Sequence, residues 1–218
     1  MSLDGPRREA ASGTTRSLVV LLHGYGADGN DLIGLAEPLS RALPDTAFVS
    51  PHAPERCAVN PMGYQWFPIS WIDGSPESAM VAGFRRAAGT LAAWLGEEMA
   101  RAGVGPAETA LVGFSQGTMM ALHVGPRLPG RLAGIVGFSG RLAPAGPEAG
   151  PVATRPPVLL VHGDSDEVIP VSALEETRAA LADDGFDVRW KVSRGIGHGV
   201  APDGLALAAE FLAAKLPR

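Results

Sequence analysis

A serine set between two glycines offers the clearest chemistry in this sequence. The stretch Gly113-Phe114-Ser115-Gln116-Gly117 has the spacing of a nucleophile elbow, a sharp turn that exposes a serine hydroxyl between a strand and a helix. An apolar, β-rich run at 109–112 precedes it, and a run suited to a helix follows it up to Val124. Glycines at both ends let the two backbones approach closely. Ser115 is therefore a candidate nucleophile.

A serine hydroxyl is a weak nucleophile at neutral pH, so Ser115 needs a base and an acid from elsewhere in the chain. Two later segments offer them, His162-Gly163-Asp164-Ser165-Asp166 and Gly197-His198-Gly199. Each follows an expected strand, and open α/β sheets place their sites at the carboxyl ends of strands. The order serine, aspartate, histidine also suits an α/β-hydrolase arrangement. Both Asp164 and Asp166 are candidates for the acid.

Short apolar runs alternate with helical stretches along the chain, which predicts an α/β protein with a mostly parallel sheet and helices on both faces. We expect strands at Leu18–Leu22, Thr46–Ser50, Thr109–Val112, Gly134–Phe138, Val158–Val161 and Asp187–Val192. We expect helices at Asp31–Leu43, about Met80–Ala102, Ser115–Val124, Ser172–Asp184 and Pro202–Lys215. The longest helix carries an apolar residue every three or four positions, which is typical of a face that packs into the core. These residues are Met80, Phe84, Ala88, Leu91, Leu95 and Met99.

Length and composition favour one compact catalytic domain spanning 1–218. A hydrophobic content of 46% with 19% charged residues is typical of a globular protein. The net charge of -5, without a basic stripe, argues against nucleic-acid binding. The aliphatic run Leu18–Leu22 is far shorter than the roughly 18 apolar residues of a membrane span, so no stable membrane insertion is expected.

The cysteine content and the first residues bear on the compartment. Cys57 is the only cysteine, which rules out an intrachain disulfide and a multi-cysteine metal site. Residues 1–17 are polar and lack the apolar core of a signal peptide. We therefore expect a cytoplasmic protein.

Two segments break the alternation of strands and helices. Pro51–Glu77 contains five prolines and several aromatic residues, so we expect an irregular loop of a kind that is more often functional than idle. Its large apolar side chains either line a site or fill a satellite core. They are Met62, Trp66, Phe67, Ile69, Trp71 and Ile72. Leu142–Pro157 is rich in Pro, Ala and Gly and is expected to be a surface connection.

The glycines of Gly24-x-Gly26-x-x-Gly29 mimic a dinucleotide fingerprint, because they follow a strand and precede a helix. A dinucleotide site also needs an acidic residue at the end of the next strand. Here the next strand runs into Pro51-His52-Ala53-Pro54 instead. We interpret these glycines as a loop that turns a backbone N–H toward an oxyanion, and we expect no cofactor.

Over nearly its whole length, the sequence resembles the α/β-hydrolase family of small carboxylesterases, lysophospholipases and acyl-protein thioesterases. The matching motifs are Leu22–Gly29, Gly113–Gly117, His162–Pro170 and Gly197–Gly199. The resemblance implies an α/β-hydrolase fold, with Ser115 as nucleophile, His198 as base and Asp166 as the orienting acid. A large cap domain is not expected. Asp164 would then brace its loop.

The resemblance also implies an oxyanion hole made by the backbone N–H groups of Tyr25 and Gln116. It places Pro51–Glu77 beside the nucleophile, where part of the segment could form an acyl pocket. The residues expected to bind substrate there are Met62, Trp66, Phe67, Ile69 and Trp71. The remaining histidines, at 23, 52, 123 and 162, are expected to be structural.

The expected reaction is hydrolysis of short- to medium-chain carboxylic esters through an acyl-enzyme, without a metal or an organic cofactor. Lysophospholipids and acyl thioesters are further candidate substrates. The alternative is an inactive α/β-hydrolase fold that serves as a binding or sensor module. The sequence leaves open which acyl group is taken and whether the protein forms a homodimer.

Overall fold

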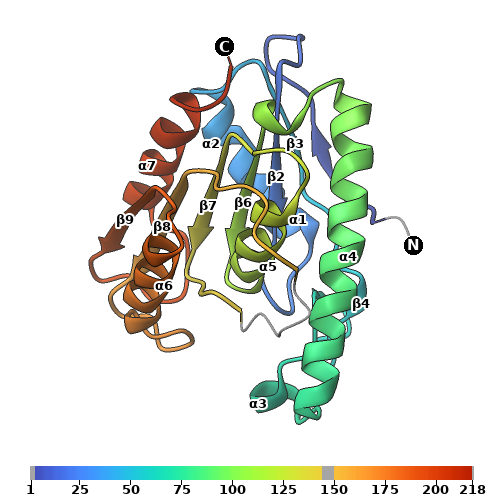
Figure 1. Ribbon diagram of the computed structural model, residues 1–218, viewed down its shortest axis with the longest axis vertical. Coiled ribbons are helices and arrows are strands. Elements are labelled where there is room, and N and C mark those ends of the chain that lie inside the picture. The colour runs from blue at the N-terminus through green and yellow to red at the C-terminus, as the bar shows by residue number, and fades with distance from the viewer. Residues whose placement is uncertain (1–2, 144–149, 218) are drawn as a thin grey trace.

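A seven-stranded sheet forms the centre of the computed structural model, which describes residues 3–143 and 150–217. The strand order is β1-β3-β2-β6-β7-β8-β9, and all neighbours are parallel except β1, which runs antiparallel to β3 at one edge (Figure 1). The strands are β1 (Arg7–Arg8), β2 (Ser17–Leu22), β3 (Thr46–Val49), β6 (Thr109–Phe114), β7 (Gly134–Phe138), β8 (Val158–Gly163) and β9 (Val188–Ser193). The predicted mostly parallel α/β sheet is confirmed.

All six predicted strands are present, with small shifts at their ends. β6 and β8 run past their predicted ends because they keep pairing with their neighbours: Phe114 lies opposite Phe138, and Gly163 lies opposite Ser193. β1 was not predicted, because two consecutive arginines carry no apolar pattern. It forms by pairing with the edge of β3, where Arg7 lies opposite Val49.

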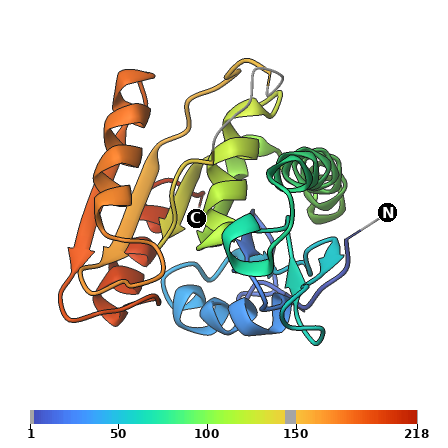
Figure 2. The ribbon, with the colours of Figure 1, turned by 90° about the horizontal axis from the view of Figure 1, so that it is seen from below.

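Helices cover both faces of the sheet, as Figures 1 and 2 show. One face carries α4 (Glu77–Ala102), α5 (Gln116–Val124) and α6 (Ser172–Asp183), and the other carries α1 (Gly29–Leu32), α2 (Ala36–Ser40) and α7 (Pro202–Ala213). Each face has its own buried apolar cluster. Phe84, Met120 and Leu174 belong to the first cluster, and Leu39 and Phe211 to the second. Central strands buried on both sides explain the nearly continuous apolar runs in their sequences.

The prediction of one helix at Asp31–Leu43 was wrong. The chain instead forms α1, a 3₁₀ turn at Ile33–Leu35, and α2, which ends at Ser40. In a continuous helix, residue 38 would donate its backbone N–H to the carbonyl of Gly34, but Pro38 has no N–H. Proline is tolerated in a first turn, so a new helix that begins at Ala36 accommodates it.

The predicted irregular loop Pro51–Glu77 contains three short regular elements. β4 (Glu55–Arg56) and β5 (Tyr64–Gln65) form an antiparallel pair, and α3 (Ser70–Asp73) follows them. α4 begins at Glu77, three residues before its predicted start, and Pro76 caps it in an extended conformation. α3 lies beyond one end of the sheet, near the first turn of α4 (Figure 1).

The predicted surface connection Leu142–Pro157 contains no helix or strand in its described part, and its residues 144–149 lie outside the described residues. In the parts of the chain that the structure describes, every helix is too short or too polar to span a bilayer.

Candidate active site

The turn at Ser115 has the backbone strain expected of a nucleophile elbow. Ser115 has φ 53° and ψ -114°, a region that non-glycine residues rarely occupy, and its N–H donates to the Phe138 carbonyl at 2.8 Å. The flanking glycines are needed for space. A Cβ on Gly117 would lie 1.9 Å from the Leu22 carbonyl oxygen, and one on Gly113 would lie 2.5 Å from the backbone of Gly117.

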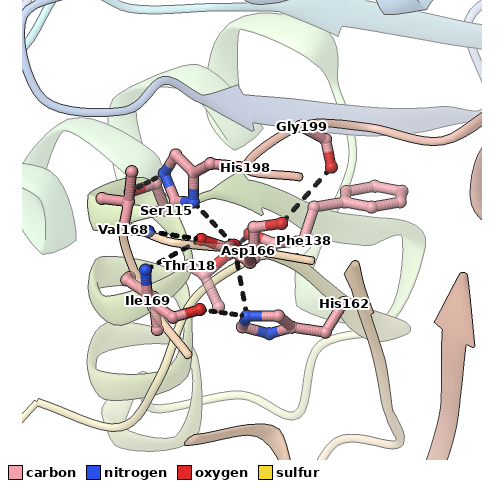
Figure 3. A network of polar contacts seen from close by, with 10 residues as sticks. Ser115, Thr118, Phe138, His162, Asp166, Val168, Ile169, His198 and Gly199 are labelled. Carbon is pink, nitrogen blue, oxygen red and sulfur yellow. Dashed lines mark hydrogen bonds and ion pairs between the residues drawn. The ribbon is translucent and has the colours of Figure 1, made fainter. Parts of the chain in front are cut away.

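Three predicted side chains meet at this turn. His198 Nε2 lies 3.0 Å from Ser115 Oγ, and His198 Nδ1 lies 2.8 Å from Asp166 Oδ2 (Figure 3). A carboxylate can only accept, so Nδ1 carries the hydrogen and the Nε2 lone pair faces the serine hydroxyl. The Asp166 side chain is fully buried, whereas that of His198 is 19% exposed. The imidazole thus remains partly exposed to solvent, whereas its carboxylate partner does not.

Hydrogen bonds keep Asp166 ionised despite its burial. Burial favours the neutral acid, but donation from His198 Nδ1 and from the N–H groups of Ile169 and Val168 outweighs it, and the pKa of Asp166 lies below its ordinary value. A second histidine also contacts this carboxylate. His162 Nε2 lies 2.8 Å from the Ile169 carbonyl and 3.3 Å from Asp166 Oδ2.

Asp164, the other candidate acid, lies in a different environment. It is exposed, and its Oδ1 accepts from the Gly195 N–H at 2.7 Å and from Ser165 Oγ at 2.9 Å. These bonds lower the pKa of Asp164 and tie the acid loop to the loop that carries His198. The geometry therefore favours Asp166 as the partner of the imidazole, with Asp164 as a brace between the loops.

The two predicted oxyanion donors belong to segments that adjoin the serine. Gln116 is the first residue of α5, so its N–H has no partner within the helix and joins the positive end of the helix dipole. The loop that carries Tyr25 passes close by, since a Cβ on Gly24 would lie 3.4 Å from Ser115 Cβ. The Tyr25 hydroxyl donates to Asp73 Oδ2 at 3.1 Å. This bond ties the loop to α3.

His23 holds the same loop from inside the protein. Its Nε2 accepts from the Ala53 N–H at 2.9 Å, so its Nδ1 carries the hydrogen and donates to the Gly24 carbonyl at 2.8 Å. Burial lowers the pKa of His23 to about 4. Both nitrogens are engaged and the ring is neutral at pH 7, which fits the structural role expected for this residue.

A largely apolar cavity of about 300 Å³ opens beside the elbow. Met119, one of its wall residues, lies one helical turn after Ser115 in α5 and donates its N–H to the Ser115 carbonyl. Aromatic, aliphatic and a few charged side chains from the segment before α3, from α3, α4 and α5, and from the loop after β7 complete the wall. They include Phe67, Trp71, Met80, Val81, Phe84, His123 and Leu142, with Glu77, Arg85 and Arg141 among the charged residues.

The five predicted substrate-binding residues are not brought together. Phe67 and Trp71 line the cavity. Trp66 is completely buried, and its indole N–H donates to the His23 carbonyl at 3.0 Å. Ile69 is also buried, whereas Met62 is 83% exposed, and neither lines the cavity. The segment is therefore partly cavity wall and partly core, so some of its aromatic side chains line a cavity and others fill the interior.

Sequence reasoning missed several contributions to the site. Met80 and Phe84 were assigned to the core stripe of the long helix, but they also line the cavity. The helical spacing of apolar residues indicates which face of the helix is buried, but it does not show whether that face meets packed side chains or a cavity. Ser139, at the end of β7, has φ 47°, and its Oγ lies 3.3 Å from the carbonyl of Gly199, next to His198. A serine directly after a buried strand beside the elbow strand was the available signal.

No cluster of three or more His, Cys, Asp or Glu side chains that could hold a metal ion occurs in residues 3–143 and 150–217.

A mostly parallel sheet with a strained serine at the carboxyl end of a central strand, and with histidine and aspartate in later loops, is the arrangement of an α/β-hydrolase. The protein is a hydrolase of this class.

Comparison with known proteins gives the family. The model of the phospholipase/carboxylesterase family matches residues 5–216, and the chain belongs to this family. The chain is 29% identical over 213 residues to acyl-protein thioesterase 1 of Gibberella zeae, with 91% of this chain and 90% of the relative covered. It is 29% identical over 204 residues to the esterase YpfH of Escherichia coli, with 93% and 84% covered.

A solved structure gives a much closer likeness. The crystal structure of esterase PE8 is 49% identical to this chain and superposes with a TM-score of 0.91, covering 99% of this chain and 100% of that one. The resemblance inferred from the four sequence motifs is confirmed.

Proposed function

We propose that the protein hydrolyses carboxylic esters through an acyl-enzyme formed on Ser115. The single observation that carries this proposal is the continuous contact from Asp166 Oδ2 to His198 Nδ1 at 2.8 Å and from His198 Nε2 to Ser115 Oγ at 3.0 Å. This chain of contacts provides a proton acceptor for the hydroxyl and a fixed tautomer for that acceptor.

In the first half-reaction, Ser115 Oγ attacks the ester carbonyl carbon as its proton passes to His198 Nε2. Asp166 stabilises the imidazolium that forms, and the backbone N–H groups of Tyr25 and Gln116 stabilise the charge on the carbonyl oxygen. One such donor is commonly worth about 2.7–4 kcal/mol in the transition state. The imidazolium then protonates the leaving alkoxide as the ester bond breaks. Water repeats the sequence on the acyl-enzyme and releases the acid.

The cavity supports short- to medium-chain acyl groups as substrates. Phe67 and Met119 give it apolar walls, Met119 donates its N–H to the Ser115 carbonyl, and the cavity volume of about 300 Å³ is at the small end for ligand sites. Each buried CH₂ contributes about 0.8 kcal/mol, so such walls favour longer chains within the cavity and tolerate shorter ones. Lysophospholipids and acyl thioesters remain candidate substrates, and the name of the Gibberella zeae relative points to thioesters.

The test of the proposal is hydrolysis of p-nitrophenyl esters by the wild type and by Ser115→Ala. We expect kcat to fall by roughly 10⁴ to 10⁶ in the variant, because the nucleophile is lost while the fold remains. A fluorophosphonate should label the wild type at Ser115 and leave the variant unlabelled. Ser40→Ala, whose hydroxyl bonds the Glu37 carbonyl in α2, is the control and should hydrolyse and label normally. Near-normal turnover in Ser115→Ala would refute the assignment.

The alternative of an inactive binding or sensor module gains no support, since the relatives and the solved structure reported above carry the names of enzymes. If the folded wild type failed to react with the fluorophosphonate, this result would favour the inactive module. A cytoplasmic location and a homodimer stay predictions. Light scattering on the purified chain tests the dimer directly.

A further inference from the structure

The side chain of Gln116 joins the nucleophile elbow to the segment between β5 and α3. Its Oε1 accepts from the Trp66 N–H at 2.8 Å, and its Nε2 donates to the Phe67 carbonyl at 2.8 Å. The side chain is buried, with 1% of the residue exposed. Only this orientation of the amide pairs both donors with acceptors, so the amide oxygen and nitrogen are assigned by their partners.

The bonded segment has little regular structure of its own. β5 ends at Gln65 and α3 begins at Ser70, so Trp66 and Phe67 lie in the gap between two short elements. No ladder or helix fixes the backbone there, and the Gln116 amide supplies a donor and an acceptor in their place. The indole of Trp66 adds one more bond, to the His23 carbonyl.

The backbone held in this way carries a wall of the cavity. The Phe67 side chain lines the cavity and packs edge-on against Phe84, with ring centroids 5.1 Å apart. Gln116 thus acts on two parts of the site. Its backbone N–H is one of the two proposed oxyanion donors, and its side chain holds the segment that carries the Phe67 wall of the cavity.

We propose that Gln116 is a positioning residue that sets acyl-chain selectivity by fixing the backbone of Trp66 and Phe67 to the elbow. The inference rests on the proposed ester hydrolysis. We expect short acyl groups to depend little on this link, and longer ones to depend on it for their contacts with the Phe67 wall.

The experiment compares Gln116→Met with a matched glutamine variant, Gln65→Met. Gln65 is also buried and its amide also makes two hydrogen bonds, with the Ala58 N–H and with Glu55 Oε2, but both lie within the β4–β5 region. Methionine keeps the length of the side chain and removes the amide. Each variant therefore loses two side-chain hydrogen bonds, and only one of them loses the link to the elbow.

The readout is the ratio of kcat/KM for p-nitrophenyl octanoate to that for the acetate. Each CH₂ in contact with the wall is worth about fourfold, so we expect Gln116→Met to lower this ratio by roughly tenfold, mainly through KM. Gln65→Met should keep the wild-type ratio. Gln116→Glu keeps the acceptor for Trp66 but not the donor for Phe67, and it should fall in between.

Hydrogen exchange of the Trp66 amide gives a second readout that does not depend on turnover. We expect faster exchange at Trp66 in Gln116→Met and unchanged exchange in Gln65→Met. The inference is overturned if Gln116→Met keeps the wild-type selectivity, or if both variants change it equally. Absence of ester hydrolysis by the wild type would instead refute the proposed function, and slow exchange at Trp66 in Gln116→Met would then separately refute the link.

Discussion

At the scale of single residues, the site depends on which oxygen and nitrogen atoms face each other. The Asp166 carboxylate fixes the tautomer of His198, and that tautomer turns a lone pair toward Ser115. The carboxylate can do this because three hydrogen bonds lower its pKa against the effect of burial. Asp164 is only two residues away, but its Oδ1 accepts hydrogen bonds from the Gly195 N–H and from Ser165 Oγ. Two aspartates of one loop thus have different partners, and we propose different roles for them.

The pair Asp166→Asn and Asp164→Asn tests this division. We expect Asp166→Asn to lower kcat by about 10⁴-fold, because an amide in that place favours the wrong tautomer of the imidazole. Asp164→Asn keeps an acceptor for the Gly195 N–H and should stay within about tenfold of the wild type. Steady-state kinetics on one ester are sufficient. Equal losses in the two variants would contradict the assignment of the acid.

At the scale of elements, the strand–turn–helix unit of β6 and α5 positions the nucleophile. α5 packs so closely against the sheet that a Cβ on Gly117 would meet the Leu22 carbonyl oxygen of β2 at 1.9 Å. A main-chain atom cannot move aside as the end of a side chain can. The glycine is therefore fixed by packing as well as by the turn itself.

Gly117→Ala should lower the free energy of unfolding by at least about 3 kcal/mol, since the added methyl group forces β2 and α5 apart. Gly89 in α4 is the matched control, because a Cβ there meets nothing within 4 Å. Gly89→Ala should raise stability by about 0.5–1 kcal/mol through helix propensity alone. Urea unfolding of the two variants measures both effects. A mild effect of Gly117→Ala would mean that α5 is less tightly packed than described.

At the scale of the whole molecule, two histidines, His23 in the core and the half-buried His123, link stability to pH. Burial lowers the pKa of His23 and the pKa of His123, each to about 4 from an ordinary value of 6.5. Between these values the unfolded chain binds more protons than the folded one, so stability rises with pH in this window. The free energy of unfolding is therefore highest above pH 6.5, where both histidines are neutral in the folded and unfolded chain, and it decreases as pH falls toward 4.

The free energy of unfolding should therefore decrease by up to about 1.4 kcal/mol per pH unit for each of these histidines on acidification below pH 6.5. His123 packs edge-on against Phe84 with centroids 4.6 Å apart, so His123→Phe keeps an aromatic ring there and removes the titration. Urea unfolding at pH 7, 6 and 5 should show a shallower pH dependence for His123→Phe than for the wild type. The two slopes should agree above pH 7, and equal slopes below it would contradict this origin.

The sequence determined the fold class and the strands and predicted the loops that carry the reacting residues, because each of these has a signal in the local sequence or in the order of motifs along the chain. Buried parallel strands require continuous apolar runs, and the elbow requires glycines at fixed spacing around Ser115. The order of serine, aspartate and histidine along the chain then identified the loops of Asp166 and His198. β1 was not predicted, because its two arginines carry no apolar pattern. The break in the helix before Pro38 was missed, although a proline inside a helical stretch was an available signal.

Only the tertiary structure decided between neighbours and assigned contacts across the chain. It separated Asp166 from Asp164 and divided Pro51–Glu77 into cavity wall at Phe67, core at Trp66 and exposed surface at Met62. The two aspartates have the same chemistry, and Phe67, Trp66 and Met62 are all large and apolar. Residue type alone therefore does not say which aspartate meets the histidine or which apolar side chain lines the cavity. The link from Gln116 to a segment some 50 positions earlier was equally hidden. The physical reason is that such contacts depend on how α5 and this segment pack, and no local pattern encodes that packing.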